Sequence, residues 1–549
     1  MLEHIDLHAI EDKNARTLIQ ELLNLVENLA GDLRDAREEV QQLRDEVNRL
    51  KGEQGKPDVK GKTRKTGAKP HSSERERREP RERQKRSKQA ELHVDREAVL
   101  RVDPETLPAD AQFKGYEEVI VQDLVVKTDN VRFKKEKYYA ASTGQTYLGA
   151  LPTGYQGQFG PGVKALVLVQ YYGQGVSEPK IHEFLKQAGI EISTGQVSNM
   201  LIHDQEQFHE EKAAVYAAGL RSSPWQQIDD TLTRVNGENH SCHVVCNPVY
   251  AAYFTHPSKD RLTVLDVLRQ GRARQYCVNA ETLTLLAHIN MARKTRRCVA
   301  GWQSPALLDE ETFMARLDTA LPRLTQRQRT WIITAAAIAA YHAETSHPIV
   351  HTLLCDDAPQ FEWLTEDRML CWVHEGRPYK KLRPFVAAHR TLVDEFLTKF
   401  WDYYRQLRAY QRAPSPEERA RLDADFDILF ATRTGFHKLD RRIAKTQAKK
   451  AALLVVLEHP ELPLHNNAAE LAVRHRVRKR DVSFGPRTQA GKEAWDTFMT
   501  LAATANKVGV SFFAYLQDRI RGTLTIPPLA ELVTQAALTL HLADSWASS

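Results

Sequence analysis

Apolar residues near the start of the chain recur in a heptad pattern. Two series, each repeating every seventh position, run through Ile19, Val26, Leu33, Val40 and Val47 and through Leu22, Leu29, Ala36, Leu43 and Leu50. The first series is mostly β-branched and the second mostly leucine, which favours a parallel two-stranded coiled coil. We therefore predict a coiled coil over residues 1–52 that makes the chain a homodimer or a higher homo-oligomer. A single amphipathic helix packed on the body is the alternative.

The pattern stops abruptly after this segment. Residues 53–98 are rich in Lys, Arg, Glu, Pro and Gly and contain few apolar side chains. Such a composition buries too little apolar surface to fold alone, so a flexible linker is predicted. Its basic charge either binds nucleic acid through the phosphates or is simply solvated.

Short runs of β-forming residues come next. EEVIVQDLVV, VRFKKEKYYA and TYLGALP are separated by turn residues and predict a small β module over 99–160 that binds DNA. The module contains no cysteine between residues 100 and 152, so it lacks thiolate ligands for zinc.

Two short helices are predicted within 161–215. SEPKIHEFLKQA and TGQVSNMLIHD flank a turn, and Ser193 with Gln196 forms a capping box for the second helix. The arrangement predicts a helix-turn-helix whose second helix presents Gln196, Ser198 and Asn199 to DNA bases. A helical hairpin that never contacts DNA has the same pattern.

Alternating patterns return in 216–270. PWQQIDDTLTRVN, an Asn236-Gly237 turn, HSCHVVCN and VYAAYFTH predict three successive antiparallel strands. Asp229 and Asp230 fall inside the first strand, where a charged pair is costly unless it is exposed or binds a cation.

A second acidic pair follows an apolar run in 347–378. PIVHTLLC predicts a buried strand that ends at Asp356 and Asp357, and MLCWVHEGR predicts another short strand. The flanking segments 271–346 and 379–460 are predicted to be helical insertions, and no role can be assigned to the first.

The helix predicted over Leu464–Arg480 carries one carboxylate, Glu470, among apolar and basic residues, with Asn466 and Asn467 one turn earlier. A carboxylate in so basic a helix suits a group that holds a metal ion against a phosphate backbone. The basic residues predicted to contact DNA are Arg474, Arg476, Arg478, Lys479 and Arg480. A solvated helix with one salt bridge is the alternative. Further helices complete 461–525, and a tail spans 526–549.

Composition and charge restrict the class of protein. The chain has 549 residues and a formal charge of +6, so several domains are expected and local basic patches matter more than the total. Six cysteines without a CxxC pair indicate a reducing compartment. No signal peptide and no apolar run long enough for a bilayer is found, which predicts a cytoplasmic, nucleoid-associated bacterial protein without a membrane partner.

The order of strands, helices and carboxylates is that of a ribonuclease H-like core. The motifs QIDDT, LLCDDAPQF, CWVHEGR, HNNAAELAVR and RKRDVSFGPRTQAGKEAWDTFMTLAATANKVGVSFFAYL resemble the insertion sequence 66 family of DDE transposases, in its zinc-less branch. The expected fold is a multidomain α+β and α/β protein: an N-terminal coiled coil, a helix-turn-helix and a ribonuclease H-like catalytic core with helical insertions.

The resemblance implies a site and its partners. Asp229, Asp356 and Glu470 would bind two Mg²⁺ or Mn²⁺ ions, and the register is open by one residue because Asp230 and Asp357 adjoin two of them. The implied partners are DNA, both the terminal inverted repeats and the target, and element-encoded accessory proteins. A non-catalytic dimeric DNA-binding regulator and a ribonuclease H-like nuclease without strand transfer are the alternatives.

Cys371 and His374 have the C-x-x-H spacing of a signature found in several transposase groups. As half of a metal site they lack partners in the sequence, so we favour a structural or DNA-positioning role and predict no zinc.

Overall fold

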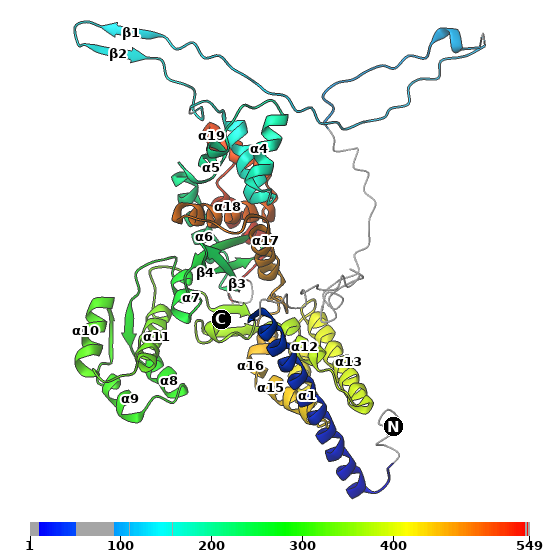
Figure 1. The fold of residues 1–549 in the computed structure, drawn as a ribbon, viewed down its shortest axis with the longest axis vertical. Helices are drawn as coiled ribbons and strands as arrows, with labels where there is room; N and C mark the ends of the chain where they lie inside the picture. Colours follow the sequence, from blue (N-terminus) through cyan, green and yellow to red (C-terminus); the bar gives the residue numbers. More distant parts are fainter. Residues whose placement is uncertain (1–9, 51–92, 109, 156, 544–545, 547–549) are drawn as a thin grey trace.

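A five-stranded mixed sheet lies at the centre of the molecule (Figure 1). The computed structural model describes residues 10–50, 93–108, 110–155, 157–543 and 546, so most of the predicted linker lies outside the described residues. The strand order is β5-β4-β3-β8-β9, antiparallel among β3, β4 and β5 and parallel from β3 to β9. The strands are β3 (Trp225–Val235), β4 (Glu238–Asn247), β5 (Tyr250–His256), β8 (Thr352–Cys355) and β9 (Asp367–Leu370).

The predicted three-strand meander is confirmed. Asn236 and Gly237 join β3 to β4 with φ angles of 49° and 80°. Positive φ at both central residues is the geometry of a type I′ turn, which matches the twist of the flanking strands, and asparagine followed by glycine adopts it at low cost.

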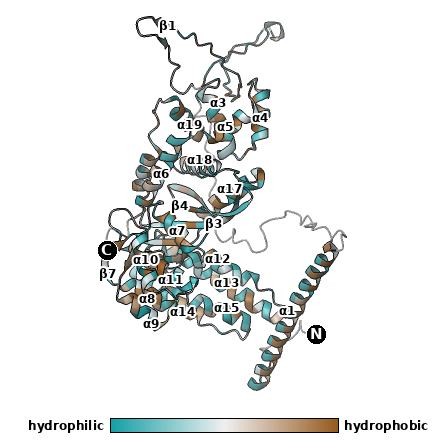
Figure 2. Ribbon diagram, turned by 60° about the vertical axis from the view of Figure 1, so that its left-hand side comes forward, coloured by the Kyte–Doolittle hydropathy of each residue, from teal (hydrophilic) through white to brown (hydrophobic). Residues whose placement is uncertain are grey.

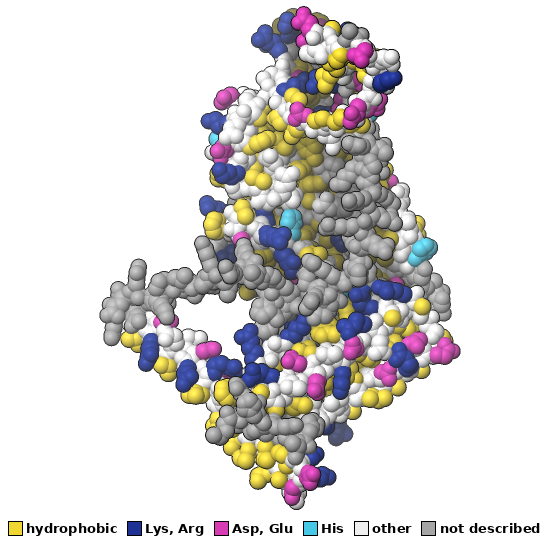
Figure 3. Space-filling model, turned by 90° about the vertical axis from the view of Figure 1, so that its right-hand side faces the viewer, with side chains coloured by type: hydrophobic (Ala, Val, Ile, Leu, Met, Phe, Trp, Pro, Cys, Tyr) yellow, Lys and Arg dark blue, Asp and Glu magenta, His cyan; other side chains and the backbone are white. Residues whose placement is uncertain are grey.

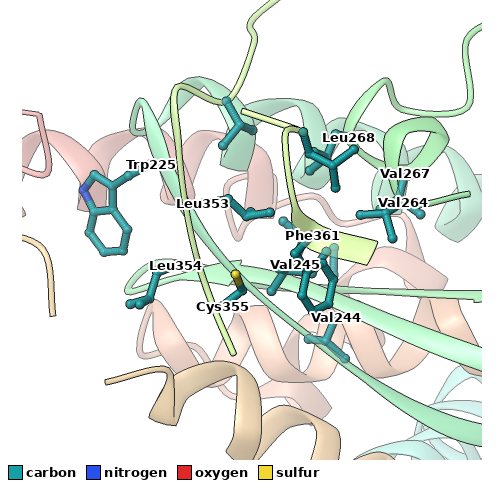
Figure 4. Packing of buried hydrophobic residues seen from close by; sticks show 14 of the residues in the cluster. Trp225, Val244, Val245, Val264, Val267, Leu268, Leu353, Leu354, Cys355 and Phe361 are labelled. Atoms are coloured by element: carbon teal, nitrogen blue, oxygen red, sulfur yellow. The ribbon is translucent and has the colours of Figure 1, made fainter. Parts of the chain in front are cut away.

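The predicted buried strand is also confirmed, as β8. It pairs in parallel with β3 on one side and with β9 on the other. Leu353, Leu354 and Cys355 are fully buried, and they pack with Val244 and Val245 of β4 (Figure 4). An interior strand can be apolar along its whole length because both of its faces are covered.

Helix α18 (Gln489–Lys507) covers the exposed edge of the sheet. Its side chains Thr504, Thr500 and Asp496 accept hydrogen bonds from the backbone N–H groups of Ala251, Tyr253 and Thr255, with N···O distances of 3.4, 3.0 and 2.7 Å. Four helical residues rise about 6 Å and two strand residues about 6.8 Å, so the two spacings nearly match. The edge strand β5 is thereby capped without another strand.

Helix α17 (Asn467–Ser483) packs against β3 and β4. Above it in Figure 1, a group of helices surrounds α18 and one end of the sheet. The group comprises α3 (Pro161–Leu168), the π-helix η4 (Val169–Gly173), α4 (Glu178–Gln187), α5 (Thr194–Ile202), α6 (Glu206–Arg221), α19 (Phe512–Arg521) and α20 (Leu529–Leu540). Helices α4 and α5 confirm the two short helices predicted there, and Ser193 caps α5 by accepting from Gln196 N at 3.2 Å.

The segment between β5 and β8 forms a lobe of its own (Figure 1). It is mostly helical, as predicted, but includes a two-stranded antiparallel sheet that the sequence did not reveal. Its elements are α7 (Arg261–Leu268), β6 (Tyr276–Val278), α8 (Ala280–His288), α9 (Arg293–Ala300), β7 (Ser304–Leu308), α10 (Glu310–Ala320) and α11 (Gln326–His342). A short 3-10 turn, η5 (Pro359–Phe361), follows β8.

A helical body follows β9. It comprises α12 (Trp372–Lys381), α13 (Ala387–Tyr410), α14 (Pro416–Phe430), α15 (His437–Gln447), α16 (Lys450–Leu453) and the 3-10 turn η6 (Val455–Leu457). The predicted strand MLCWVHEGR is therefore wrong in its second half, because β9 ends at Leu370 and α12 begins two residues later. Trp372 is buried against Phe400 and Tyr403 of α13, and this aromatic packing selects the helix.

The predicted coiled-coil segment is one long helix, α1 (Lys13–Leu50). Its first half docks on the helical body through a face distinct from the heptad seam. Glu27 accepts hydrogen bonds from Phe385 N and Val386 N at the start of α13, at 2.9 and 3.0 Å. Asn24 accepts from His437 N at the start of α15, at 3.1 Å. Both side chains satisfy helix N-termini whose N–H groups lack intrahelical partners.

The heptad seam of α1 faces solvent over most of its length. Hydrophobic positions remain visible along the projecting helix in Figure 2. The seam residues that are about half exposed or more are Leu22, Leu29, Leu33, Val40, Leu43, Val47 and Leu50. The helix therefore combines the two alternatives considered from sequence, since one face packs on the body and another stays uncovered.

The predicted β module is smaller than expected. Only β1 (Lys137–Ala140) and β2 (Gln145–Leu148) form a hairpin, and the described residues before them include one 3-10 turn, η3 (Pro104–Thr106), but no strand. EEVIVQDLVV is therefore not a strand here, because it has no partner strand and its apolar side chains, such as Val121 and Leu124, are exposed. Among the described residues, no helix is both long and apolar enough to cross a membrane.

Candidate active site

Three predicted carboxylates converge on one side of the sheet. Asp229 lies in the middle of β3, Asp356 directly follows β8, and Glu470 is in the first turn of α17. Burial, together with the charges of Asp356 and Glu470, raises the pKa of Asp229 to about 7. Strands β3 and β8 are adjacent and parallel, and Asn466 at the start of α17 donates to Ile228 O beside Asp229, so the three carboxylates lie on neighbouring elements and are called the cluster below.

Burial also raises the pKa of Asp356, and the neighbouring carboxylates Asp230 and Asp357 add to this effect. One Asp356 oxygen accepts a hydrogen bond from Ala358 N at 3.1 Å, which partly offsets the rise. The cluster is therefore rich in carboxylate oxygen atoms, an arrangement that a bound cation would stabilise.

The adjacent aspartates have other partners. Asp230 accepts from Gln360 Nε2 at 2.6 Å and lies 3.8 Å from Lys259 Nζ. Side chains alternate along a strand, so Asp230 and Asp229 point to opposite faces of the sheet. Asp357 is exposed and pairs with Lys449 at 2.5 Å and Arg368 at 3.6 Å. Both neighbours thus have partners of their own, while their charges also act on Asp356. Asp229 and Asp356 remain the predicted pair.

Helix α12 presents three functional groups to Glu470. Arg377 Nη2 lies 3.0 and 3.3 Å from the two Glu470 oxygens, and His374 Nε2 lies 3.4 Å from Oε1. Cys371, His374 and Glu470 each offer a ligand atom within 4.8 Å of the others. The sequence reasoning assigned no role to Arg377, because a strand would alternate its side chains, whereas a helix aligns positions three apart.

Asn466 connects the start of α17 to strand β3. Its Nδ2 donates to Ile228 O, next to Asp229, at 2.7 Å. Its backbone N–H donates to Cys371 Sγ at 3.3 Å. Asn466 and Cys371 are both buried and thus connect β3, α12 and α17 at the site. Asn467, the other asparagine of the pair, is the first residue of α17 and is half-buried.

The opposite side of α12 is fixed to the helical body. Buried Glu375 accepts from Thr446 Oγ1 at 2.6 Å and pairs with Arg442 and, at 3.0 Å, with Lys449. Lys449 also binds Asp357, next to Asp356. The segment predicted as the second helical insertion therefore supports both α12 and the end of β8.

The predicted base-reading residues lie on α5. Asn199 is exposed and Gln196 and Ser198 are half-buried, while Val197 and Met200 pack inward. On the face drawn in Figure 3, Lys and Arg side chains are spread widely and alternate with acidic ones. Any contacts of these basic side chains with the phosphate backbone of DNA would therefore come from several elements.

On α17, the predicted DNA contacts divide into two groups. Arg474 and Arg478 are exposed, and Arg480 is half-buried and bonds to Leu232 O. The prediction is wrong for Arg476 and Lys479, which are 0% and 1% exposed and cannot reach DNA. Their charges are used inside the protein.

Arg476 compensates the negative charge of Asp496 on α18, the helix that caps the sheet edge. It lies 3.5 Å from Asp496 of α18, donates to Thr255 Oγ1 at 3.0 Å and stacks over Trp495. Lys479 lies 3.1 Å from the centre of the Tyr171 ring and donates to Val176 O at 3.2 Å. Burial lowers the pKa of Lys479 to about 7.

The donor set of the cluster fits a divalent ion. Mg²⁺ and Mn²⁺ prefer oxygen ligands, and Asp229, Asp356 and Glu470 supply carboxylate oxygens whose mutual repulsion such ions relieve. Cys371 and His374 offer softer ligand atoms beside Glu470. Glu470 is therefore a candidate third ligand for the Cys371 and His374 half-site, which the sequence did not reveal. Arg377 already pairs with that carboxylate, and the absence of zinc stays a prediction.

The fold and the site define a mixed α/β protein with an acidic cluster at its central sheet, whose oxygen donors fit a divalent ion. Comparison with known proteins identifies the family. The sequence model described as "Transposase IS66 family" matches residues 156–278 and 312–494, more than half of the chain. This protein belongs to the IS66 family of transposases. An uncharacterized protein, y4jO of Sinorhizobium fredii, is 31% identical over 324 residues, which cover 58% of this chain and 99% of the relative.

The buried lysine provides a test of the packing around α17. Unfolded lysine has a pKa of about 10.4, so above pH 7 the unfolded state binds more protons than the folded one and stability increases with pH. Relative to Lys479→Met, the wild type should gain up to about 2 kcal/mol between pH 7 and pH 9. Urea unfolding of both proteins at the two pH values measures this difference, and parallel pH responses would contradict it.

Proposed function

We propose that this transposase cuts DNA at the ends of a bacterial insertion sequence and joins the freed 3′-hydroxyl to target DNA. The observation that carries the proposal is the convergence of Asp229, Asp356 and Glu470 from two adjacent strands and one helix. Their environment suits a divalent-metal site, and membership of the IS66 transposase family supports a DNA substrate.

We also propose a ribonuclease H-like fold for the core. The antiparallel β3-β4-β5 meander continues into parallel strands β8 and β9, and helices pack on the sheet. Carboxylates in the middle of β3, after β8 and on α17 match the arrangement expected for that fold. We extend the proposal to the domains: coiled coil, linker, β module, helix-turn-helix, a split core with two insertions, and a tail, with the boundaries predicted from sequence.

Asp229, Asp356 and Glu470 would hold two Mg²⁺ or Mn²⁺ ions. Bound ions of this kind activate the attacking oxygen and stabilise the leaving oxygen of a phosphodiester. The protein contributes half-buried carboxylate oxygens, and Asn466 connects β3 to α17 beside them. In cleavage, water forms the new P–O bond and the 3′-oxygen leaves. In strand transfer that 3′-hydroxyl attacks a target phosphodiester, whose own 3′-oxygen leaves.

Recognition of DNA is assigned to α4 and α5 as a helix-turn-helix. Asn199 is exposed on α5, and Gln196 and Ser198 are half-buried on the same helix. Arg474, Arg478 and Arg480 on α17 are proposed to contact the phosphate backbone near the carboxylates. Phosphate contacts position DNA, whereas contacts to base edges specify its sequence.

The exposed seam of α1 supports a homodimer. Apolar side chains that recur every seven residues and face solvent match what a second copy of the same helix would cover. A non-catalytic dimeric regulator would use the same surfaces but gives the carboxylate cluster no purpose. A nuclease without strand transfer would use the cluster, so strand-transfer products separate it from a transposase.

The carboxylates should be essential for chemistry. Loss of an outer-shell partner typically costs about 10–100-fold, so removing a ligand itself by Asp229→Ala, Asp356→Ala or Glu470→Ala should lower Mg²⁺-dependent cleavage more than about 100-fold. Binding of the same DNA ends should change little. Asp357→Asn, beside Asp356 but paired with Lys449, is the matched control and should keep most activity. Full activity of Glu470→Ala would refute the assignment.

Helix α5 should control selectivity and not general affinity. Changing Gln196 and Asn199 to Ala should reduce preference for terminal over scrambled duplexes by about 1–3 kcal/mol per lost base contact. Binding to scrambled DNA should stay nearly constant, because phosphates carry that affinity. Competition binding across a salt series measures both quantities. If selectivity survives in the double variant, another element reads the ends.

The seam of α1 should determine the oligomeric state. Replacing Leu29 and Leu43 with Glu places charges on the heptad seam, and the full chain should dissociate, as measured by light scattering. The docking of α1 on the body uses buried residues such as Leu23, which the double variant leaves unchanged, so the variant should keep its fold. A wild-type protein that is monomeric at micromolar concentration would rule out the dimer.

A further inference from the structure

Arg377 lies where it can exchange one anion for another. Its Nη2 bridges both oxygens of Glu470, whose side chain is 10% exposed, while Arg377 itself is 31% exposed. One end of the pair is thus part of the acidic cluster, and the other end reaches solvent.

Without metal, the ion pair of Arg377 with Glu470 compensates the negative charge of the carboxylate cluster. Glu470 adds to the negative charge around Asp229, and a buried carboxylate without a compensating charge is costly. Arg377 supplies that charge, and His374, 3.4 Å from the same oxygen, narrows the positions that the carboxylate can take.

Binding of two divalent ions would change the net charge of the cluster from negative to positive. Two divalent ions carry more positive charge than three carboxylates cancel, so a guanidinium on Glu470 would be repelled by the ions. Arg377 contacts Glu470 through Nη2, so once it is released from this carboxylate its guanidinium can form the forked contact that such groups make with phosphate.

We propose that Arg377 neutralises Glu470 in the free protein and binds a DNA backbone phosphate once divalent ions occupy the carboxylates. This rests on the proposed function, because it takes Glu470 as a metal ligand. Arg377 would then favour metal binding only when DNA is present, which limits the loading of the site without its substrate.

The surroundings of α12 fit such an exchange. Glu375 on the other side of the helix is held by Thr446 and Lys449, so the backbone of α12 stays fixed. A change of partner then requires rotation of the Arg377 side chain and no movement of the helix.

Titration of the full-length protein with Mn²⁺, without DNA, tests the first half of the proposal. Arg377→Gln should bind Mn²⁺ about 5–10-fold more tightly than wild type, because a competing cation is removed. Arg368→Gln, which removes a guanidinium paired with Asp357, is the control and should bind Mn²⁺ like wild type. An equal gain in both variants, or no gain in Arg377→Gln, would overturn the proposal.

Binding of a duplex with and without Ca²⁺ tests the second half. The metal should strengthen DNA binding of the wild type more than that of Arg377→Gln, since the variant has no guanidinium to release. Arg377→Lys keeps the charge without the fork, so it should match wild type in Mn²⁺ binding and fall between the two in the DNA assay. If the Gln variant does not fold, the Lys variant decides: a metal effect on DNA binding equal to that of wild type would overturn the proposal.

Glu470→Gln separates this inference from the proposed function. Loss of Mn²⁺ binding in Glu470→Gln together with unchanged binding in Arg377→Gln would reject the exchange and leave Glu470 as a ligand. Unchanged Mn²⁺ binding and full cleavage in Glu470→Gln would reject the metal-site assignment itself.

Discussion

The position of Glu470 depends on a buried ion pair some distance along the same helix. Arg476 of α17 pairs with Asp496 of α18, and Asp496 in turn accepts from the backbone of Thr255 on the edge strand β5. Breaking a buried pair by removing one partner typically costs about 3–5 kcal/mol. The pair thus fixes α17, the helix that carries Glu470, against both the sheet and α18.

The same interaction solves the problem of the sheet edge. An uncovered edge strand offers its N–H groups to other chains, and α18 satisfies them with Thr504, Thr500 and Asp496. The charge of Asp496 makes this cap strong but requires Arg476 nearby. A basic residue that resembles a DNA contact in the sequence is therefore part of the core.

At the other end of α17, the site is assembled from segments far apart in the chain. Asn466 joins α17 to β3 and to Cys371, and α12 is held from its far side by the helical body. Helix α1 caps the N-termini of α13 and α15 in that body. The segment predicted as the second helical insertion thus has a structural role, since it holds α12 beside Glu470.

The sequence by itself determined the local elements and the candidate carboxylates. Periodicity gave α1, the Asn236-Gly237 turn gave the β3-β4 hairpin, and acidic residues at the ends or centres of apolar strands marked Asp229 and Asp356. These features depend on neighbouring residues alone. Tertiary structure decided the rest: aromatic packing around Trp372 turned a predicted strand into α12 and aligned Arg377 with Glu470, and burial withdrew Arg476 and Lys479 from the surface. Burial and partner choice depend on residues that lie tens to hundreds of positions away, so no local pattern encodes them.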